Sequence, residues 1–140
     1  MRLTTAILAL TLMAAQASAN EAATASINKI RAARGLAPVS YSEVLEKTAL
    51  GHAKDMYSKG FFSHKGSNGS TIGKRARRAG YKFCIIAENI AKGQKSLEIA
   101  MNGWRDSPSH YANMTLKQVR EFAVVQQGDV WVMVLGARKC

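Results

Sequence analysis

Two histidines and one glutamate are the residues of this sequence whose types and settings could do chemistry. His64 and His110 each lie in a predicted loop just after a helix, beside small polar residues, and Glu88 directly follows the apolar run 83–87. Two imidazoles and a carboxylate can bind a divalent metal ion or act as a general acid and base. Spacing alone does not show that the three side chains converge, so the hypothesis depends on the elements that carry them.

The same side chains also have plainer structural interpretations. His64 and His110 would then hold loops in place, and Glu88 would accept hydrogen bonds from the backbone amides of a turn that includes Asn89. A third histidine, His52, lies in the middle of a predicted helix on its buried edge, where we expect a structural role.

No hydrolase nucleophile is evident. The stretch Gly66–Ser70 lacks the spacing and the preceding strand of a nucleophile elbow. Trp104 and Trp131 lie within strong apolar patterns, and we expect both in the core rather than in a ligand platform.

Helical spacing dominates the first two thirds of the chain. It predicts a helix over Glu21–Arg34 and a second helix that starts at the capping-box sequence Ser40–Glu43 and ends at Lys59. A short basic helix, capped by Ser70 or Thr71, extends to Gly80, and a further helix follows the cap Ser96 and includes Trp104.

Strand-like composition marks the remainder. Phe83–Ile86 reads as a strand and Glu88–Gly93 as a turn, whereas the β-rich runs 122–125 and 130–135 predict a hairpin. Helices followed by strands, without regular alternation, indicate an α+β fold in which helices pack on a small antiparallel sheet.

The first nineteen residues have the features of a secretory signal peptide. A basic start at Arg2 precedes an apolar run over Ala6–Ala15, and Ala17-Ser18-Ala19 has the small residues that signal peptidase requires. We therefore expect cleavage near Ala19, residues 20–140 as one domain, and a secreted or periplasmic location. The apolar run is far shorter than the roughly 20 residues that span a bilayer, so we expect no transmembrane segment.

Charge and cysteine content refine this interpretation. The 140 residues carry a net charge of +11, and 47% are hydrophobic, which excludes a disordered basic tail. Without the leader, 19 basic and 9 acidic residues remain, a net charge of +10. Cys84 and Cys140 are the only cysteines, and export favours a disulfide between them over two free thiols. Two sulfurs are too few for a cysteine zinc cage.

Five basic residues form the densest charge cluster of the chain: Lys74, Arg75, Arg77, Arg78 and Lys82. The cluster is either a solvated helix face or a contact surface for anionic lipids or envelope polymers. Nucleic acid is disfavoured as a partner because no aromatic residues are interleaved to stack on bases.

A set of short motifs resembles the CAP superfamily, the SCP-like group of cysteine-rich secretory proteins, antigen 5 and pathogenesis-related proteins. The motifs occur in the order of that family and span nearly the whole domain: Asn28-x-x-Arg31, Gly35-Leu36, Phe61-Phe62-Ser63-His64, Gly80-Tyr81, Glu88-Asn89-Ile90-Ala91-x-Gly93 and Trp104-x-x-Ser107-Pro108-x-His110-x-x-Asn113.

The resemblance implies an α-β-α sandwich, a secreted protein and a surface groove that holds two histidines and two acidic residues. It places His64, Glu88 and His110 in that groove, together with Asn68, Asn89 and Asn113. The fourth acidic residue has no counterpart, because residues 65–87 contain no Asp or Glu and Asn68 would supply only a neutral oxygen.

Three functions follow as hypotheses. The first is a monomeric, non-enzymatic protein that needs no cofactor and binds a lipid, sterol or anionic envelope ligand in the groove. The second is a metal-dependent hydrolase in which His64 and His110 hold Zn²⁺ or another divalent cation, with Glu88 as base or ligand. The third is a structural envelope protein whose polar cluster only stabilises the fold.

Overall fold

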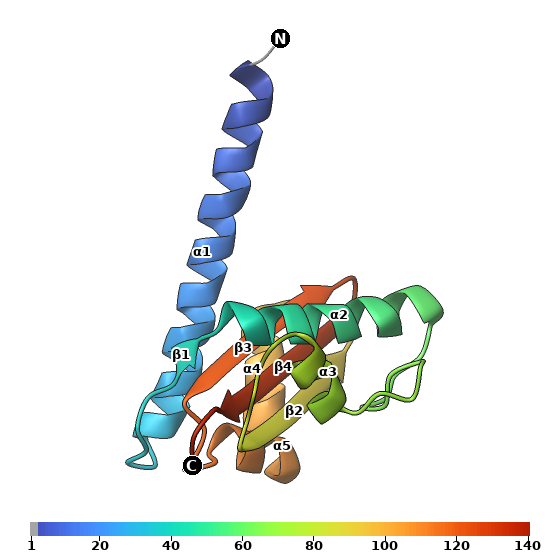
Figure 1. Cartoon of the computed structure of the whole chain (residues 1–140). Helices are drawn as coiled ribbons and strands as arrows, with labels where there is room; N and C mark the ends of the chain where they lie inside the picture. The colour runs from blue at the N-terminus through green and yellow to red at the C-terminus, as the bar shows by residue number, and fades with distance from the viewer. Residues whose placement is uncertain (1–2) are drawn as a thin grey trace.

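A four-stranded sheet between two layers of helices makes up the computed structural model, which describes residues 3–140 (Figure 1). The strands are β1 (Ser40–Tyr41), β2 (Ile85–Lys92), β3 (Glu121–Gln127) and β4 (Val130–Ala137). Their order in the sheet is β1-β3-β4-β2, in which β1 pairs parallel to β3 and the other neighbours are antiparallel. The helices are α1 (Leu3–Ala32), α2 (Glu43–Lys59), α3 (Ile72–Arg78), α4 (Leu97–Arg105) and α5 (Pro108–Met114).

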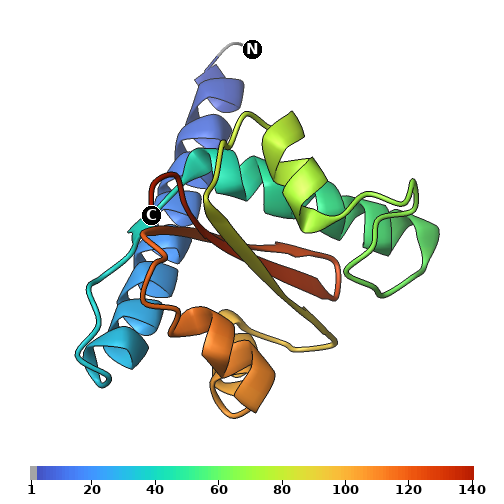
Figure 2. The same ribbon diagram turned by 60° about the horizontal axis from the view of Figure 1, so that its bottom comes forward.

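The two faces of the sheet bury two separate cores. Helices α2 and α3 cover one face, and α4 and α5 lie on the other together with part of α1 (Figure 2). Successive side chains of a strand point to opposite faces, so Val132 and Val134 of β4 pack toward α2 while Met133 and Leu135 pack toward α1 and α4. The predicted α+β sandwich and the β3–β4 hairpin are both confirmed.

Helix α1 continues without a break through the predicted cleavage site. Its N-terminal half projects away from the sheet (Figure 1), and residues 12–19 are exposed. Its C-terminal half buries Ala23, Ile27 and Arg31, and the Arg31 guanidinium donates to the carbonyls of Met114 and Leu116. Residues 1 and 2 of the predicted signal peptide lie outside the described residues. No helix within residues 3–140 is both long enough and apolar enough to cross a membrane.

Helix α2 has the buried face that its spacing predicts, formed by Leu45, Thr48, Ala49, His52, Ala53 and Met56. Its cap differs from the expectation. Ser42 rather than Ser40 caps the helix, because the Ser42 hydroxyl accepts from the amide of Leu45, whereas Ser40 pairs in β1. The cap of α3 is Thr71, one of the two predicted residues.

The turn predicted at Glu88–Gly93 is wrong. Residues up to Lys92 belong to β2, which pairs with β4 along its whole length, and only Gly93, at a φ of 94°, turns the chain. The polar residues Glu88 and Asn89 are typical of a turn. In the fold, however, their backbone groups form hydrogen bonds with β4, and their side chains have hydrogen-bond partners, so both residues can lie in a buried strand.

The loop predicted around His110 is also wrong. The chain breaks after α4, as Pro108 indicates, and then re-enters a helix at once, with Pro108 in the first turn of α5. Proline suits that position because the first amides of a helix have no intrahelical partner. His110 therefore lies in a helix that packs against β2.

Candidate functional site

Glu88 is the centre of a buried polar network at the edge of the sheet. It lies on β2 and faces α2 and α3, and its side chain is only 2% exposed. One carboxylate oxygen, Oε1, lies 2.8 Å from Nδ1 of His64, and the other, Oε2, accepts from Nη2 of Arg75 at 2.7 Å. Both oxygens of the carboxylate are thus engaged by positively charged or hydrogen-bonding side chains of the protein itself.

Arg75 belongs to this network, although its place in a basic cluster predicts a surface position. Its side chain is 9% exposed, and besides Glu88 its Nη1 donates to the carbonyls of Ser70 and His64. One signal could have found it. Arg75 lies three residues after Ile72 and one before Ala76, on the stripe of α3 that packs inward.

His52 closes the network from α2. Its Nε2 donates to the carbonyl of Ser63 at 2.8 Å and lies 3.9 Å from Oε1 of Glu88. Burial lowers the pKa of His52, although the nearby Glu88 charge opposes that shift. With its proton on Nε2, the ring presents an unprotonated Nδ1, which has no hydrogen-bond partner among the described residues. The expected structural role of His52 agrees with its burial.

His110 lies on the other side of β2, in the first turn of α5. Its Nδ1 lies 2.8 Å from the hydroxyl of Ser107. Burial lowers the pKa of His110, and the charge of His64 lowers it further. No described hydrogen bond joins the two histidines.

The asparagines of the predicted groove have different settings. Asn89 is fully buried, donates to the carbonyl of His110 and accepts from Asn113, so the pair fastens α5 to β2. Asn113 also donates to the carbonyl of Glu88. Asn68 is elsewhere. Its Oδ1 accepts from the amide of Ser70, and the side chain lines a pocket between α2 and α3 rather than the surface beside His64.

The surface along β2 is hollowed in two places rather than one. A cavity of about 590 Å³ is lined by His64, Glu88 and Asn113, together with Ile72 and Ile86. A second cavity of about 340 Å³ has a mainly apolar lining that includes Phe62, Ile90 and Trp104. His110, Lys92, Gln94 and Ser107 are its polar lining residues. The two histidines therefore border neighbouring hollows instead of sharing one.

The donor set does not fit a tightly bound divalent cation. Glu88 is already paired with Arg75, whose positive charge opposes a metal ion, and Nδ1 of His64 is bound to the carboxylate. This leaves the Nε2 atoms of His64 and His110, one ligand fewer than the three protein ligands of a catalytic zinc site. No group of three or more His, Cys, Asp or Glu suited to a metal occurs in the described part of the chain.

The remaining basic cluster and the cysteines complete the predicted residues. Lys74, Arg77, Arg78 and Lys82 are exposed, whereas Arg75 is not available to a surface partner. Arg77 stacks on Phe83, with its guanidinium carbon 4.3 Å from the ring centre. The predicted disulfide between Cys84 and Cys140 is present and ties the start of β2 to the C-terminus.

These features define a class of protein: an α-β-α sandwich with a disulfide and a histidine–glutamate network at the edge strand. The sequence matches the cysteine-rich secretory protein (CAP) family over residues 24–134. The chain belongs to this family, as its motifs suggested.

Known proteins that resemble the chain come from several bacteria. It is 30% identical over 106 residues to the uncharacterized protein YkwD of Bacillus subtilis, covering 74% of this chain and 41% of YkwD. An extracellular SCP-domain protein of Bacillus anthracis superposes with a TM-score of 0.81 at 25% identity, covering 86% of this chain and 40% of that one. An outer surface protein of Borrelia burgdorferi gives a TM-score of 0.75 at 22% identity, covering 83% of this chain and 90% of that one. The chain thus spans about two fifths of YkwD and of the B. anthracis protein.

Proposed function

We propose that this chain is an exported CAP domain that binds a lipid or other envelope ligand in the hollows beside His64 and His110 and catalyses no reaction. The observation that carries the proposal is the state of Glu88. Its carboxylate is held by Arg75 and His64, so it is not free to activate water or to hold a metal. What remains accessible at the site is a hollow with an apolar lining, which suits an apolar ligand group.

Export is supported by two independent features. The disulfide between Cys84 and Cys140 is the kind that persists in oxidising compartments, and the matched B. anthracis protein is extracellular. An exported basic domain with a net charge of +10 after leader removal would meet anionic lipids and wall polymers. Phe62, 47% exposed at the rim of the apolar hollow, offers a contact point for such a ligand.

Vesicle binding tests the proposal. Residues 20–140 would be sedimented with vesicles of phosphatidylethanolamine and phosphatidylglycerol at physiological salt, with and without Phe62→Asp. We expect the substitution to abolish binding, because it places a charge at the apolar rim. Ile99→Asp is the matched control, since Ile99 is 51% exposed on α4 and does not line the hollow.

Three results would contradict the proposal. Absence of binding of the unmodified protein to lipids and to envelope fractions would remove its basis. Stoichiometric zinc that is retained after dialysis and lost in His64→Ala/His110→Ala would instead favour a metal site. A double variant that loses only stability, with ligand binding unchanged, would favour a structural role.

A further inference from the structure

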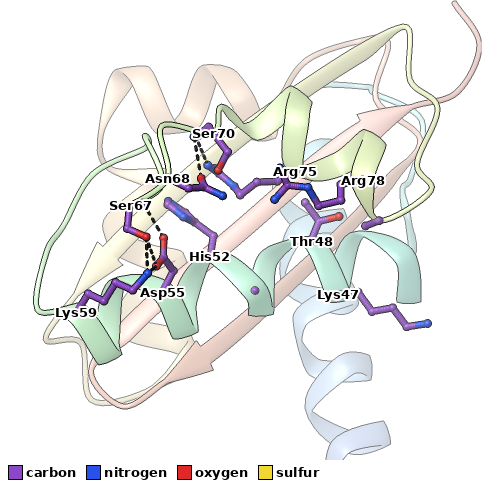
Figure 3. A pocket seen from close by; sticks show the side chains of 12 residues that line it. Lys47, Thr48, His52, Asp55, Lys59, Ser67, Asn68, Ser70, Arg75 and Arg78 are labelled. Atoms are coloured by element: carbon purple, nitrogen blue, oxygen red, sulfur yellow. Dashed lines mark hydrogen bonds and ion pairs between the residues drawn. The ribbon is translucent and has the colours of Figure 1, made fainter.

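A third pocket lies between α2, α3 and the loop 66–70, separate from the two hollows along β2. It encloses about 360 Å³, and ten of its twelve lining residues are polar or charged (Figure 3). Thr48 and His52 contribute from α2, Arg75 from α3, and Asn68 and Ser70 from the loop. Most of these residues have no part in the groove that the sequence motifs predict.

Two of the residues that line this pocket each carry a buried polar atom that lacks a hydrogen-bond partner. Nδ1 of His52 and Nε of Arg75 are both buried and make no hydrogen bond among the described residues. Their side chains are at most 9% exposed. Buried polar groups nearly always have a hydrogen-bond partner in folded proteins, so two exceptions among the residues of one pocket call for a physical reason.

The unmet atoms have opposite hydrogen-bonding characters. Nε2 of His52 donates to the carbonyl of Ser63, so the neutral ring offers an acceptor at Nδ1. Nε of Arg75 can only donate. Arg75 cannot turn to satisfy it without loss, because its other nitrogens already bind Glu88, His64 and Ser70. A hydroxyl group can donate a hydrogen bond to Nδ1 of His52 and accept one from Nε of Arg75, so it suits both atoms.

The mouth of the pocket is positively charged. Lys47 and Arg78 line it, both are exposed, and neither forms an ion pair with any described residue. The acidic residue of the pocket, Asp55, is already neutralised by Lys59 at 3.0 Å. Burial alone would raise its pKa, but hydrogen bonds from Ser67 and Lys59 bring the pKa of Asp55 to about 2. The unpaired cations therefore decide the sign of the field at the mouth, which favours an anion.

We propose that this pocket is a second binding site, for a phosphorylated polyol such as a glycerol phosphate group. The phosphate is held at the mouth by Lys47 and Arg78, and a hydroxyl reaches His52 and Arg75 when the exposed side chain of Asn68 turns aside. That side chain has a single described hydrogen bond, to the amide of Ser70, so little opposes its movement. The site does not depend on ligand binding beside His64 and His110.

Titration of residues 20–140 with glycerol 3-phosphate, followed by ¹⁵N NMR, tests the site. We expect saturable shifts of the Arg75 Nε–H and His52 ring nitrogen signals. Inorganic phosphate lacks the hydroxyl and should perturb only amides near Lys47 and Arg78. Vesicles with phosphatidylglycerol, compared with phosphatidylcholine, separate a lipid head group from the free compound as the source, and binding of either source supports the site.

A matched pair of double variants separates the pocket from general charge. Lys47→Ala/Arg78→Ala removes one cation from each helix at the mouth, and we expect binding to weaken about fivefold or more. Lys54→Ala/Lys74→Ala removes the same charge from exposed positions of the same helices outside the pocket and should change binding less than about twofold. Equal weakening by both variants, or no saturable shift at His52 and Arg75 at tens of millimolar ligand, would overturn the proposal.

Discussion

Replacement of Arg75 by Met is the sharpest test of the network around Glu88. The substitution keeps most of the length of the side chain but removes the cation that lies 2.7 Å from a carboxylate of which only 2% is exposed. It also deprives the carbonyls of Ser70 and His64 of a donor. Because an unpaired charge would remain buried, we expect the free energy of unfolding to fall by about 3–5 kcal/mol. For a domain of this size that corresponds to a melting temperature lower by roughly 10–20 °C.

A double-mutant cycle shows whether the loss comes from the charge. Glu88→Gln alone leaves Arg75 without its counter-charge, whereas Arg75→Met/Glu88→Gln removes both charges together. The double variant should therefore be more stable than the sum of the single losses by about 1–3 kcal/mol. Lys74→Met, an exposed position on the same helix, is the control and should change stability by no more than about 0.5 kcal/mol.

Urea denaturation of the disulfide-intact protein, followed by far-ultraviolet circular dichroism, measures each free energy. The reasoning is refuted if Arg75→Met costs less than about 1 kcal/mol. It is also refuted if the two single losses add within about 0.5 kcal/mol, because distant and independent sites behave in that way.

Three further outcomes follow from the same structure. Cys84→Ser/Cys140→Ser removes a disulfide that joins residues 56 positions apart and should lower the unfolding free energy, measured by urea denaturation, by about 4 kcal/mol. An unchanged midpoint would show that the disulfide contributes nothing to stability. Burial holds the pKa of His52 below its usual range, so the unfolded chain binds a proton at a higher pH than the folded chain, and stability should fall as the pH drops below about 6.5. His52→Gln should flatten that pH dependence in urea titrations over about pH 5–8, and an unchanged slope would assign the pH dependence to other groups. Gly128 has a φ of 58°, and the Tyr57 ring occupies the place of an added Cβ, so Gly128→Ala should lower the unfolding free energy by about 1–3 kcal/mol. Gly51 faces open space on α2, so Gly51→Ala should raise the unfolding free energy by up to about 1 kcal/mol. Equal thermal shifts in the two variants would contradict this.

Local patterns predicted the elements whose structure depends on near neighbours. The buried face of α2 follows from helical spacing alone, since residues three and four apart lie on one side of a helix. The β3–β4 hairpin follows from two β-rich runs around Gly128, which adopts the positive φ that the turn needs. Burial of Trp104 and Trp131 also agrees with their apolar surroundings.

The errors fall where a distant partner decides the conformation. Glu88 and Asn89 have the composition of a turn, but pairing with Val134 and Met133 of β4 extends β2 through them. His110 follows a helix-breaking sequence, yet α5 forms there because Asn89 and Asn113 fasten it to β2.

Composition and local sequence patterns are enough to predict a leader-like start, a basic domain, the family motifs, the buried helix faces and the one disulfide that two cysteines allow. Long-range packing alone settles which charges meet. In the structure Arg75 pairs with Glu88, although the sequence places it in a basic surface cluster. Asn68 lines a different pocket from His64, and His64 and His110 border two separate hollows. The physical reason is that a buried charge needs an oppositely charged partner, and the packing of α3 on β2 determines which residue is close enough to pair with it. The spacing of residues in the sequence does not predict that contact.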